Sequence, residues 1–220
     1  MRSCRSVKLL DLFCGGGLAA WGYWRSGRFT EIIGVDINGD MRDQYAFDFL
    51  QADALSLTYE FLMQFDLVHA SPPCQAYSYL TPNKSLHPRL ILPVKHMLYA
   101  AGIPHVIENV PGSAAELRPN VEMNGHYFGL LSDRPRYFYV SGLQKPLRWV
   151  RRRGSDMSLI KINGAEFVNR AELIRGMGLT EMISPHRLKM IRRRAIEEGI
   201  PPLMTKAIAE LVIRQKAMIG

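Results

Sequence analysis

Short apolar runs alternate with helix-like segments along the first 140 residues. The runs are compact, and Gly, Pro or Asp closes most of them, which is typical of buried strands. They lie at residues 7–13, 31–37, 65–70, 105–108 and 137–141. Between them, helices are predicted over residues 18–24, 41–49 and 90–101. Short strands that alternate with helices predict an α/β fold with a doubly wound, mainly parallel sheet.

The pattern changes after the last of these strands. Residues 141–167 lose the periodicity and are rich in basic side chains, whereas residues 170–177 and 201–218 are predicted to be helical. The sequence therefore predicts a core of residues 1–140, a short basic insert of residues 141–167, and C-terminal helices, residues 168–220, that complete the core.

The composition is that of a globular protein, with 47% hydrophobic and 22% charged residues, so a fully disordered chain is excluded. No run approaches the ~18 consecutive apolar residues of a membrane helix. The basic start of the chain leads into a run that is too short and too glycine-rich for a signal peptide. Only three cysteines are present, without the spacing of a metal site. We therefore expect a cytoplasmic protein without disulfides, metal or membrane contact.

The net charge of +8 is concentrated towards the C-terminus. Residues 1–130 hold 10 Lys and Arg against 12 Asp and Glu, whereas residues 131–220 hold 18 against 8. Two arginine triplets, at residues 151–153 and 192–194, are the densest points. One triplet alone is usually a solvated helix face, but two triplets with this asymmetry favour a polyanionic partner such as a nucleic acid.

The first candidate motif is a glycine-rich turn at residues 11–17, Asp-Leu-Phe-Cys-Gly-Gly-Gly, directly after the first predicted strand. Glycines at a strand-to-helix turn let a ligand approach the backbone and the free N–H groups of the helix. Asp36 ends the second strand, where an acidic residue commonly binds ribose hydroxyls. The pair indicates a nucleotide-like cofactor and leaves its identity open. A packing role for the glycines is the alternative.

Three further motifs follow or enter predicted strands. Cys74, in Ser-Pro-Pro-Cys-Gln, stands on a stiff loop, where a thiol is placed like a nucleophile, whereas the Cys14 thiol is expected to be structural. Glu108, in Glu-Asn-Val-Pro, can donate a proton if burial raises its pKa. Arg134 and Arg136 are two residues apart, so on a strand both would point the same way and could grip an oxyanion. For each motif a structural role is the alternative.

The order and spacing of these motifs resemble the cytosine-C5 DNA methyltransferase family. The resemblance runs from residue 9 to about residue 209, and Pro-Pro-Cys-Gln followed by Glu-Asn-Val is its most specific part. It implies a Rossmann-like fold that uses S-adenosylmethionine and releases S-adenosylhomocysteine, in a bacterial, archaeal or phage-infected cell. The cofactor-binding residues that it implies are Phe13, Cys14, Gly15, Gly16, Gly17, Asp36, Ile37, Asp53, Ala54 and Pro73.

The resemblance also implies a mechanism. Cys74 attacks C6 of a flipped-out cytosine, which makes C5 able to accept the methyl group. Glu108 contacts N3 of the base, and Arg136 holds the O2 carbonyl. Loss of the C5 proton and elimination of Cys74 then restore the ring, and no metal is required. The chain is thus interpreted as a DNA (cytosine-5-)-methyltransferase.

A nucleic-acid surface is implied beside this site and in the insert. Family members normally carry a sizeable target-recognition domain, whereas residues 141–167 are too few to build a core of their own. They offer a basic loop that suits phosphates, and a partner protein could supply sequence specificity. The nucleic-acid-binding residues expected on this basis are Gln75, Ser78, Arg134, Trp149, Arg151, Arg152 and Arg153.

Three positions depart from the family pattern. Tyr77 and Ser132 replace the usual phenylalanine and glutamine, and Glu198 stands where an asparagine usually helps to hold the cofactor, so Glu198 is left out of the expected site.

Two alternative functions stay open. One is an RNA methyltransferase, since one branch of the family methylates tRNA with the same catalytic residues. The other is a nucleic-acid-binding protein with a weakly active methyltransferase fold, although a binding module needs none of the three catalytic residues.

Overall fold

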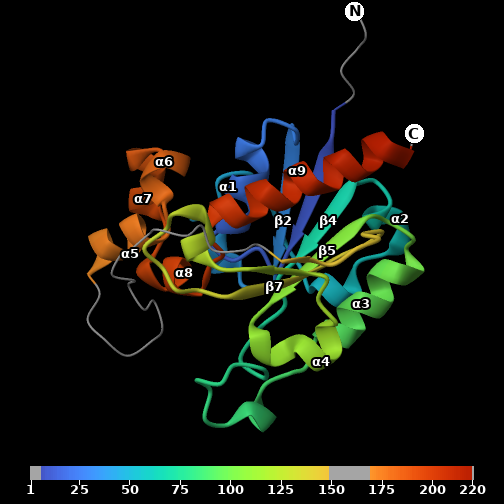
Figure 1. Ribbon diagram of the computed structural model, residues 1–220, viewed down its shortest axis with the longest axis horizontal. Helices are drawn as coiled ribbons and strands as arrows, with labels where there is room; N and C mark the ends of the chain where they lie inside the picture. The colour runs from blue at the N-terminus through green and yellow to red at the C-terminus, as the bar shows by residue number, and fades with distance from the viewer. Residues whose placement is uncertain (1–5, 149–168, 220) are drawn as a thin grey trace, which may run out of the picture.

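The computed structural model describes residues 6–148 and 169–219 of the 220-residue chain. Its centre is an eight-stranded sheet with the order β3-β2-β1-β4-β5-β7-β6-β8 (Figure 1). Neighbours from β3 to β5 are parallel, and β7 runs antiparallel to both β5 and β6. The strands are β1 (Lys8–Leu12), β2 (Glu31–Asp36), β3 (Asp48–Gln51), β4 (Leu67–Ala70), β5 (His105–Asn109), β6 (Val121–Met123), β7 (Arg136–Val140) and β8 (Leu147–Arg148). The predicted doubly wound, mainly parallel α/β sheet is confirmed.

Helices cover both faces of the sheet. Consecutive strand residues point to opposite faces, and Leu9 packs with Tyr23 of α1 and Ile208 of α9, whereas Leu10 packs with Leu98 of α3. A third apolar cluster joins α5 to α8 with the start of α1. The helices are α1 (Leu18–Arg25), α2 (Tyr59–Leu62), α3 (Ile91–Ala100), α4 (Ala114–Leu117), α5 (Arg170–Gly176), α6 (Leu179–Met182), α7 (Pro185–Met190), α8 (Arg193–Glu198) and α9 (Pro202–Ile219).

The C-terminal helix α9 completes the core by lying directly against α1, as Figure 1 shows. The two backbones approach closely at Gly22, where an added Cβ would lie 2.0 Å from Thr205 Oγ1 and 2.1 Å from the carbonyl oxygen of Pro202. The Thr205 hydroxyl also donates a hydrogen bond to the carbonyl of Ala19, at 2.9 Å. Glycine is therefore required at residue 22, and α9 belongs to the same core as α1.

The helix predicted over residues 41–49 is wrong. A 3-10 turn occupies Gly39–Met41, capped by the side chain of Asn38, and residues 48–51 form the edge strand β3 instead. Tyr45, Phe47 and Phe49 gather with one another and with the core under α1, which favours an extended chain over a helix here. Residues 147–148 of the predicted insert pair with β6 as β8, and residues 149–167 lie outside the described residues.

The parallel strands β1, β2, β4 and β5 place their carboxyl ends along one edge of the sheet, which is where open α/β sheets bind ligands.

Within the described part of the chain, no helix is both long and apolar enough to cross a membrane. No group of three or more His, Cys, Asp or Glu side chains in residues 6–148 and 169–219 is placed to hold a metal ion.

Candidate active site

A cleft of about 570 Å³ opens at the carboxyl edge of the sheet. Its walls come from the turn after β1, the end of β2, the loop after β4, the end of β5, the start of β7 and the region of α8. The lining residues lie in the segments 11–19, 36–44, 71–75, 108–110 and 192–200, together with Arg136. The cleft thus joins the glycine turn to the three predicted catalytic residues.

The glycine turn has a backbone that other residues could not easily follow. Phe13, Gly15 and Gly17 have φ angles of 57°, 47° and 80°, in the left-handed region that favours glycine. A Cβ on Gly16 would lie 2.6 Å from the Cβ of Ala195 in α8, and one on Gly17 would lie 2.9 Å from the ring of Tyr45. The turn is therefore packed between α8 and Tyr45, which accounts for Gly16 and Gly17 by packing. Gly15 lines the cleft with no described atom within 4 Å of where its Cβ would be, so the backbone is open to a ligand there.

Asp36 braces this turn from the end of β2. One carboxylate oxygen accepts a hydrogen bond from the backbone N–H of Gly15, and the other accepts from the N–H of Asn38, each at 2.9 Å. Asp36 and Ile37 both line the cleft, and the Ile37 side chain is 71% exposed. Asp53 instead caps a short 3-10 turn by accepting from the N–H of Leu55. Neither Asp53 nor the buried Ala54 is among the residues that line the cleft.

Cys74 stands half-buried on the loop after β4. Asn109 holds this loop by donating a hydrogen bond to the carbonyl of Pro72 at 2.8 Å, and the N–H groups of Tyr77 and Ser78 both donate to the carbonyl of Cys74 at 2.9 Å. Burial raises the pKa of the Cys74 thiol above its ordinary value, and the positive charge of Arg136 offsets only part of that increase. The buried Cys14 thiol has a pKa raised far above its ordinary value, chiefly by burial. Of these two thiols, Cys74 is the one placed against a cation.

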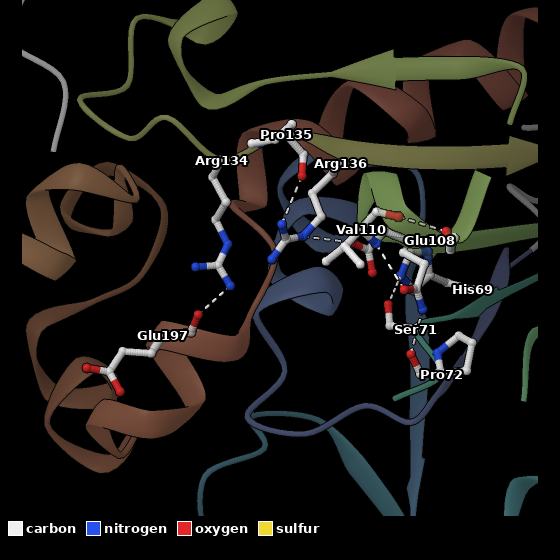
Figure 2. A network of polar contacts seen from close by, with 11 residues as sticks. His69, Ser71, Pro72, Glu108, Val110, Arg134, Pro135, Arg136 and Glu197 are labelled. Atoms are coloured by element: carbon white, nitrogen blue, oxygen red, sulfur yellow. Dashed lines mark hydrogen bonds and ion pairs between the residues drawn. The ribbon is translucent and has the colours of Figure 1, made fainter. Parts of the chain in front are cut away.

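Glu108 and Arg136 form a buried ion pair at the end of β5 and the start of β7. The Arg136 Nε lies 2.8 Å from Glu108 Oε1, and the Arg136 Nη1 donates to the carbonyl of Pro135 at 2.9 Å (Figure 2). Burial raises the pKa of Glu108, and the charge of Arg136 and a hydrogen bond from Ser71 oppose that increase. The cleft therefore holds an acid with a raised pKa beside a fixed guanidinium.

Of the predicted nucleic-acid contacts, Gln75 lines the cleft and Ser78 does not. Arg136 lines the cleft and Arg134 does not. Arg134 precedes β7, and its buried guanidinium donates a hydrogen bond to the backbone carbonyl of Glu197 (Figure 2). Arg134 thus ties β7 to α8. The remaining residues of this group, Trp149, Arg151, Arg152 and Arg153, lie outside the described residues.

Several cleft residues were missed by the sequence reasoning. Asp11 is buried, accepts a hydrogen bond from the Tyr45 hydroxyl at 3.0 Å, and has a pKa raised to about 8, mainly by burial. Asp11 is the first residue of the glycine motif, and this position could have indicated that it lies at the cleft. Arg194 and Glu198 reach the cleft as an ion pair of 2.7 Å on α8, so Glu198 lines the site from which it was left out. The family position of Glu198 was a signal for its place at the cleft, whereas the approach of Arg194 to the cleft depends on the packing of α8 against the glycine turn.

The fold is similar to that of two solved methyltransferases. The S. pombe Dnmt2 methyltransferase matches with a TM-score of 0.63 and 14% identity, over 96% of this chain and 99% of that one. The Entamoeba histolytica methyltransferase EhMeth matches with a TM-score of 0.63 and 13% identity, over 98% and 99%. No protein-family model matches the sequence, and no curated protein sequence does. The chain thus shares the fold of these two methyltransferases, a Rossmann-like, mainly parallel α/β sheet.

Proposed function

We propose that this protein is a cytosine-C5 methyltransferase that transfers a methyl group from S-adenosylmethionine to DNA. The observation that carries the proposal is that Cys74, Glu108 and Arg136 face one cleft, whose other wall is the glycine turn beside Asp36. A nucleophile, an acid and an oxyanion-binding group around one cavity fit a group-transfer enzyme better than a binding module. The likeness in fold to two methyltransferases supports the same class of reaction.

The cleft fits S-adenosylmethionine in size and in the residues it presents. Its volume of about 570 Å³ suits a small cofactor. Gly15 lines the cleft, and no described atom lies within 4 Å of where its Cβ would be, so that the cofactor can lie against the backbone there. Asp36 would accept hydrogen bonds from the ribose hydroxyls, and Ile37 would cover the adenine ring. When bound, the cofactor supplies an electrophilic methyl group.

Cys74, Glu108 and Arg136 would activate the cytosine ring for methyl transfer. The Cys74 thiolate gives its electron pair to a new S–C6 bond, and the displaced π electrons of the ring make C5 nucleophilic. Glu108 in its protonated form donates a hydrogen bond to N3, and the Arg136 guanidinium holds the O2 carbonyl, so that both draw electron density away from C6. After methyl transfer, solvent water accepts the C5 proton, the electron pair of the C5–H bond forms the C5=C6 double bond, and the S–C6 pair returns to Cys74 as a thiolate, which restores the aromatic ring.

Changing Asp36 to alanine should weaken binding of S-adenosylhomocysteine by about 1–3 kcal/mol, because hydrogen bonds to a charged acceptor are lost. The loss includes the brace on Gly15, which the carboxylate also holds. Calorimetric titration of the purified protein measures the affinity, with Asp48→Ala on the exposed edge strand as a matched control. An unchanged affinity in the Asp36 variant would remove this residue from the cofactor site.

Methyl transfer to three polymers in parallel tests the proposed function. Radiolabelled S-adenosylmethionine is incubated with the full chain and duplex DNA, single-stranded DNA or tRNA, and the labelled nucleoside is identified by chromatography. We expect 5-methylcytosine in duplex DNA. Label in tRNA alone would change the substrate to RNA, and label on another base would contradict the cytosine-C5 assignment.

A further inference from the structure

A row of polar side chains crosses the core beneath α1 and ends at the predicted acid. The hydroxyl of Tyr23 lies 3.0 Å from Nδ1 of His69, and Nε2 of His69 lies 2.9 Å from the hydroxyl oxygen of Ser71. Ser71 in turn makes a side-chain hydrogen bond to Glu108. Figure 2 shows the last three of these residues side by side, next to Arg136. Tyr23, His69 and Glu108 are all buried.

The sheet itself places these groups together. His69 and Glu108 lie on the neighbouring parallel strands β4 and β5, and Val106 pairs with His69 in register. Val106 packs in the core beneath α1, and Glu108, two residues further on, points to the same face. The Tyr23 side chain extends from α1 onto that face, and its ring makes an edge-to-face contact with the His69 ring. Strand alternation and α1 therefore place Tyr23, His69 and Glu108 on one face, and Ser71, the first residue after β4, joins His69 to Glu108.

When Glu108 is ionised, the donor and the acceptor of every hydrogen bond in this row can be assigned. A carboxylate only accepts, so Ser71 donates its one proton to Glu108. The Ser71 oxygen then accepts from His69 Nε2–H, and His69 Nδ1, which carries no proton in a neutral ring, accepts from the Tyr23 hydroxyl. Burial lowers the pKa of His69 to about 3 and raises the pKa of Tyr23, so both are neutral near pH 7. One arrangement thus satisfies all four groups.

We propose that Tyr23 and His69 are positioning residues that hold the Ser71 hydroxyl on Glu108 and so set the orientation and proton affinity of the catalytic acid. This inference rests on the role of Glu108 in the proposed function. Neither Tyr23 nor His69 is among the residues that line the cleft, so both act through Ser71, which does line it. The charged and titratable groups that face Glu108 are Arg136 at the start of β7, Arg134 before it and the Cys74 thiol after β4.

Ser71→Ala and Ser71→Thr form the decisive pair of variants. Loss of a donor to a carboxylate disfavours the charged form, so the pKa of Glu108 should rise by about one pH unit in Ser71→Ala and should stay near the wild-type value in Ser71→Thr. Infrared titration of the full chain measures it through the protonated-carboxyl band, which Glu108→Gln identifies. His69→Leu should raise the same pKa, and His69→Gln, which keeps a donor near the position of Nε2, should restore it.

Equal Glu108 pKa values in Ser71→Ala and Ser71→Thr would overturn the proposal. If the buried His69→Leu variant fails to fold, Tyr23→Phe takes its place, because it keeps the ring and removes only the hydroxyl that donates to His69. A Glu108 pKa in Tyr23→Phe equal to that of the wild type would then overturn the positioning roles of Tyr23 and His69. The infrared titration uses no substrate. A shifted pKa in a protein that transfers no methyl group would therefore support this row of hydrogen bonds and contradict the proposed function. In an active protein, the pH at which methyl transfer declines as Glu108 loses its proton should move upward with the Ser71→Ala shift.

Discussion

Changing Cys74 to serine should lower the rate of methyl transfer by roughly a thousandfold or more, because a neutral hydroxyl is a far weaker nucleophile than a thiolate. The exchange preserves the shape of the side chain, so the loop braced by Asn109 should keep its structure. The rate is measured in a single turnover with labelled S-adenosylmethionine and cytosine-containing duplex DNA.

Two controls accompany this variant. Thermal unfolding and the affinity for S-adenosylhomocysteine should both match the wild type, because Cys74 is a half-buried loop residue and the glycine turn is untouched. If Cys74→Ser transferred methyl groups within tenfold of the wild-type rate, the covalent mechanism would be wrong for this protein.

Changing Glu108 to alanine should slow methyl transfer by about 10²–10⁴-fold, the usual contribution of a positioned acid. Cytosine N3 would lose its hydrogen-bond donor, and C6 would be less electrophilic toward Cys74. Glu108→Gln is the matched variant, because it keeps an N–H donor and the shape but has no proton to transfer, and it should lose less. A rate in the alanine variant equal to that of the wild type would remove Glu108 from the reaction.

The same substitution tests the ion pair. Arg136 would be left buried without its carboxylate partner, which typically destabilises a protein by about 3–5 kcal/mol. The rates must therefore be compared at a temperature at which circular dichroism shows both variants to be folded. A large loss of stability with an unchanged rate would assign Glu108 and Arg136 to structure and not to catalysis.

Much of the site could be predicted from the sequence because parallel strands bring their carboxyl ends to one edge. The glycine turn, Asp36, Cys74 and Glu108 each end or follow a short apolar run, and Phe13, Asp36, Cys74 and Glu108 line one cleft, whereas Asp53 and Ala54 are not among its lining residues. The turn after a strand has only a few residues in which to place a side chain, so spacing located these positions, whereas their roles in cofactor binding and catalysis came from the family resemblance.

The remaining features depend on contacts between distant segments. Arg134 was expected to share the direction of Arg136, but the strand begins only at Arg136, and α8 draws Arg134 away. His69 sits in a run that reads simply as a buried strand, and its partner Tyr23 is 46 residues away in the sequence. Such pairings arise from how α1 and α8 pack, which local patterns do not encode.

The most direct test of the central claim is covalent capture on 5-fluorocytosine. After Cys74 adds to C6 and C5 receives the methyl group, fluorine at C5 leaves no proton to remove, so the S–C6 bond persists. Wild-type protein is incubated with S-adenosylmethionine and duplex DNA or tRNA that carries 5-fluorocytosine, and the adduct is mapped by peptide mass spectrometry. The account predicts a stable adduct at Cys74 on duplex DNA that is absent from Cys74→Ser. An adduct that maps to Cys14, or no adduct with either polymer, would contradict it.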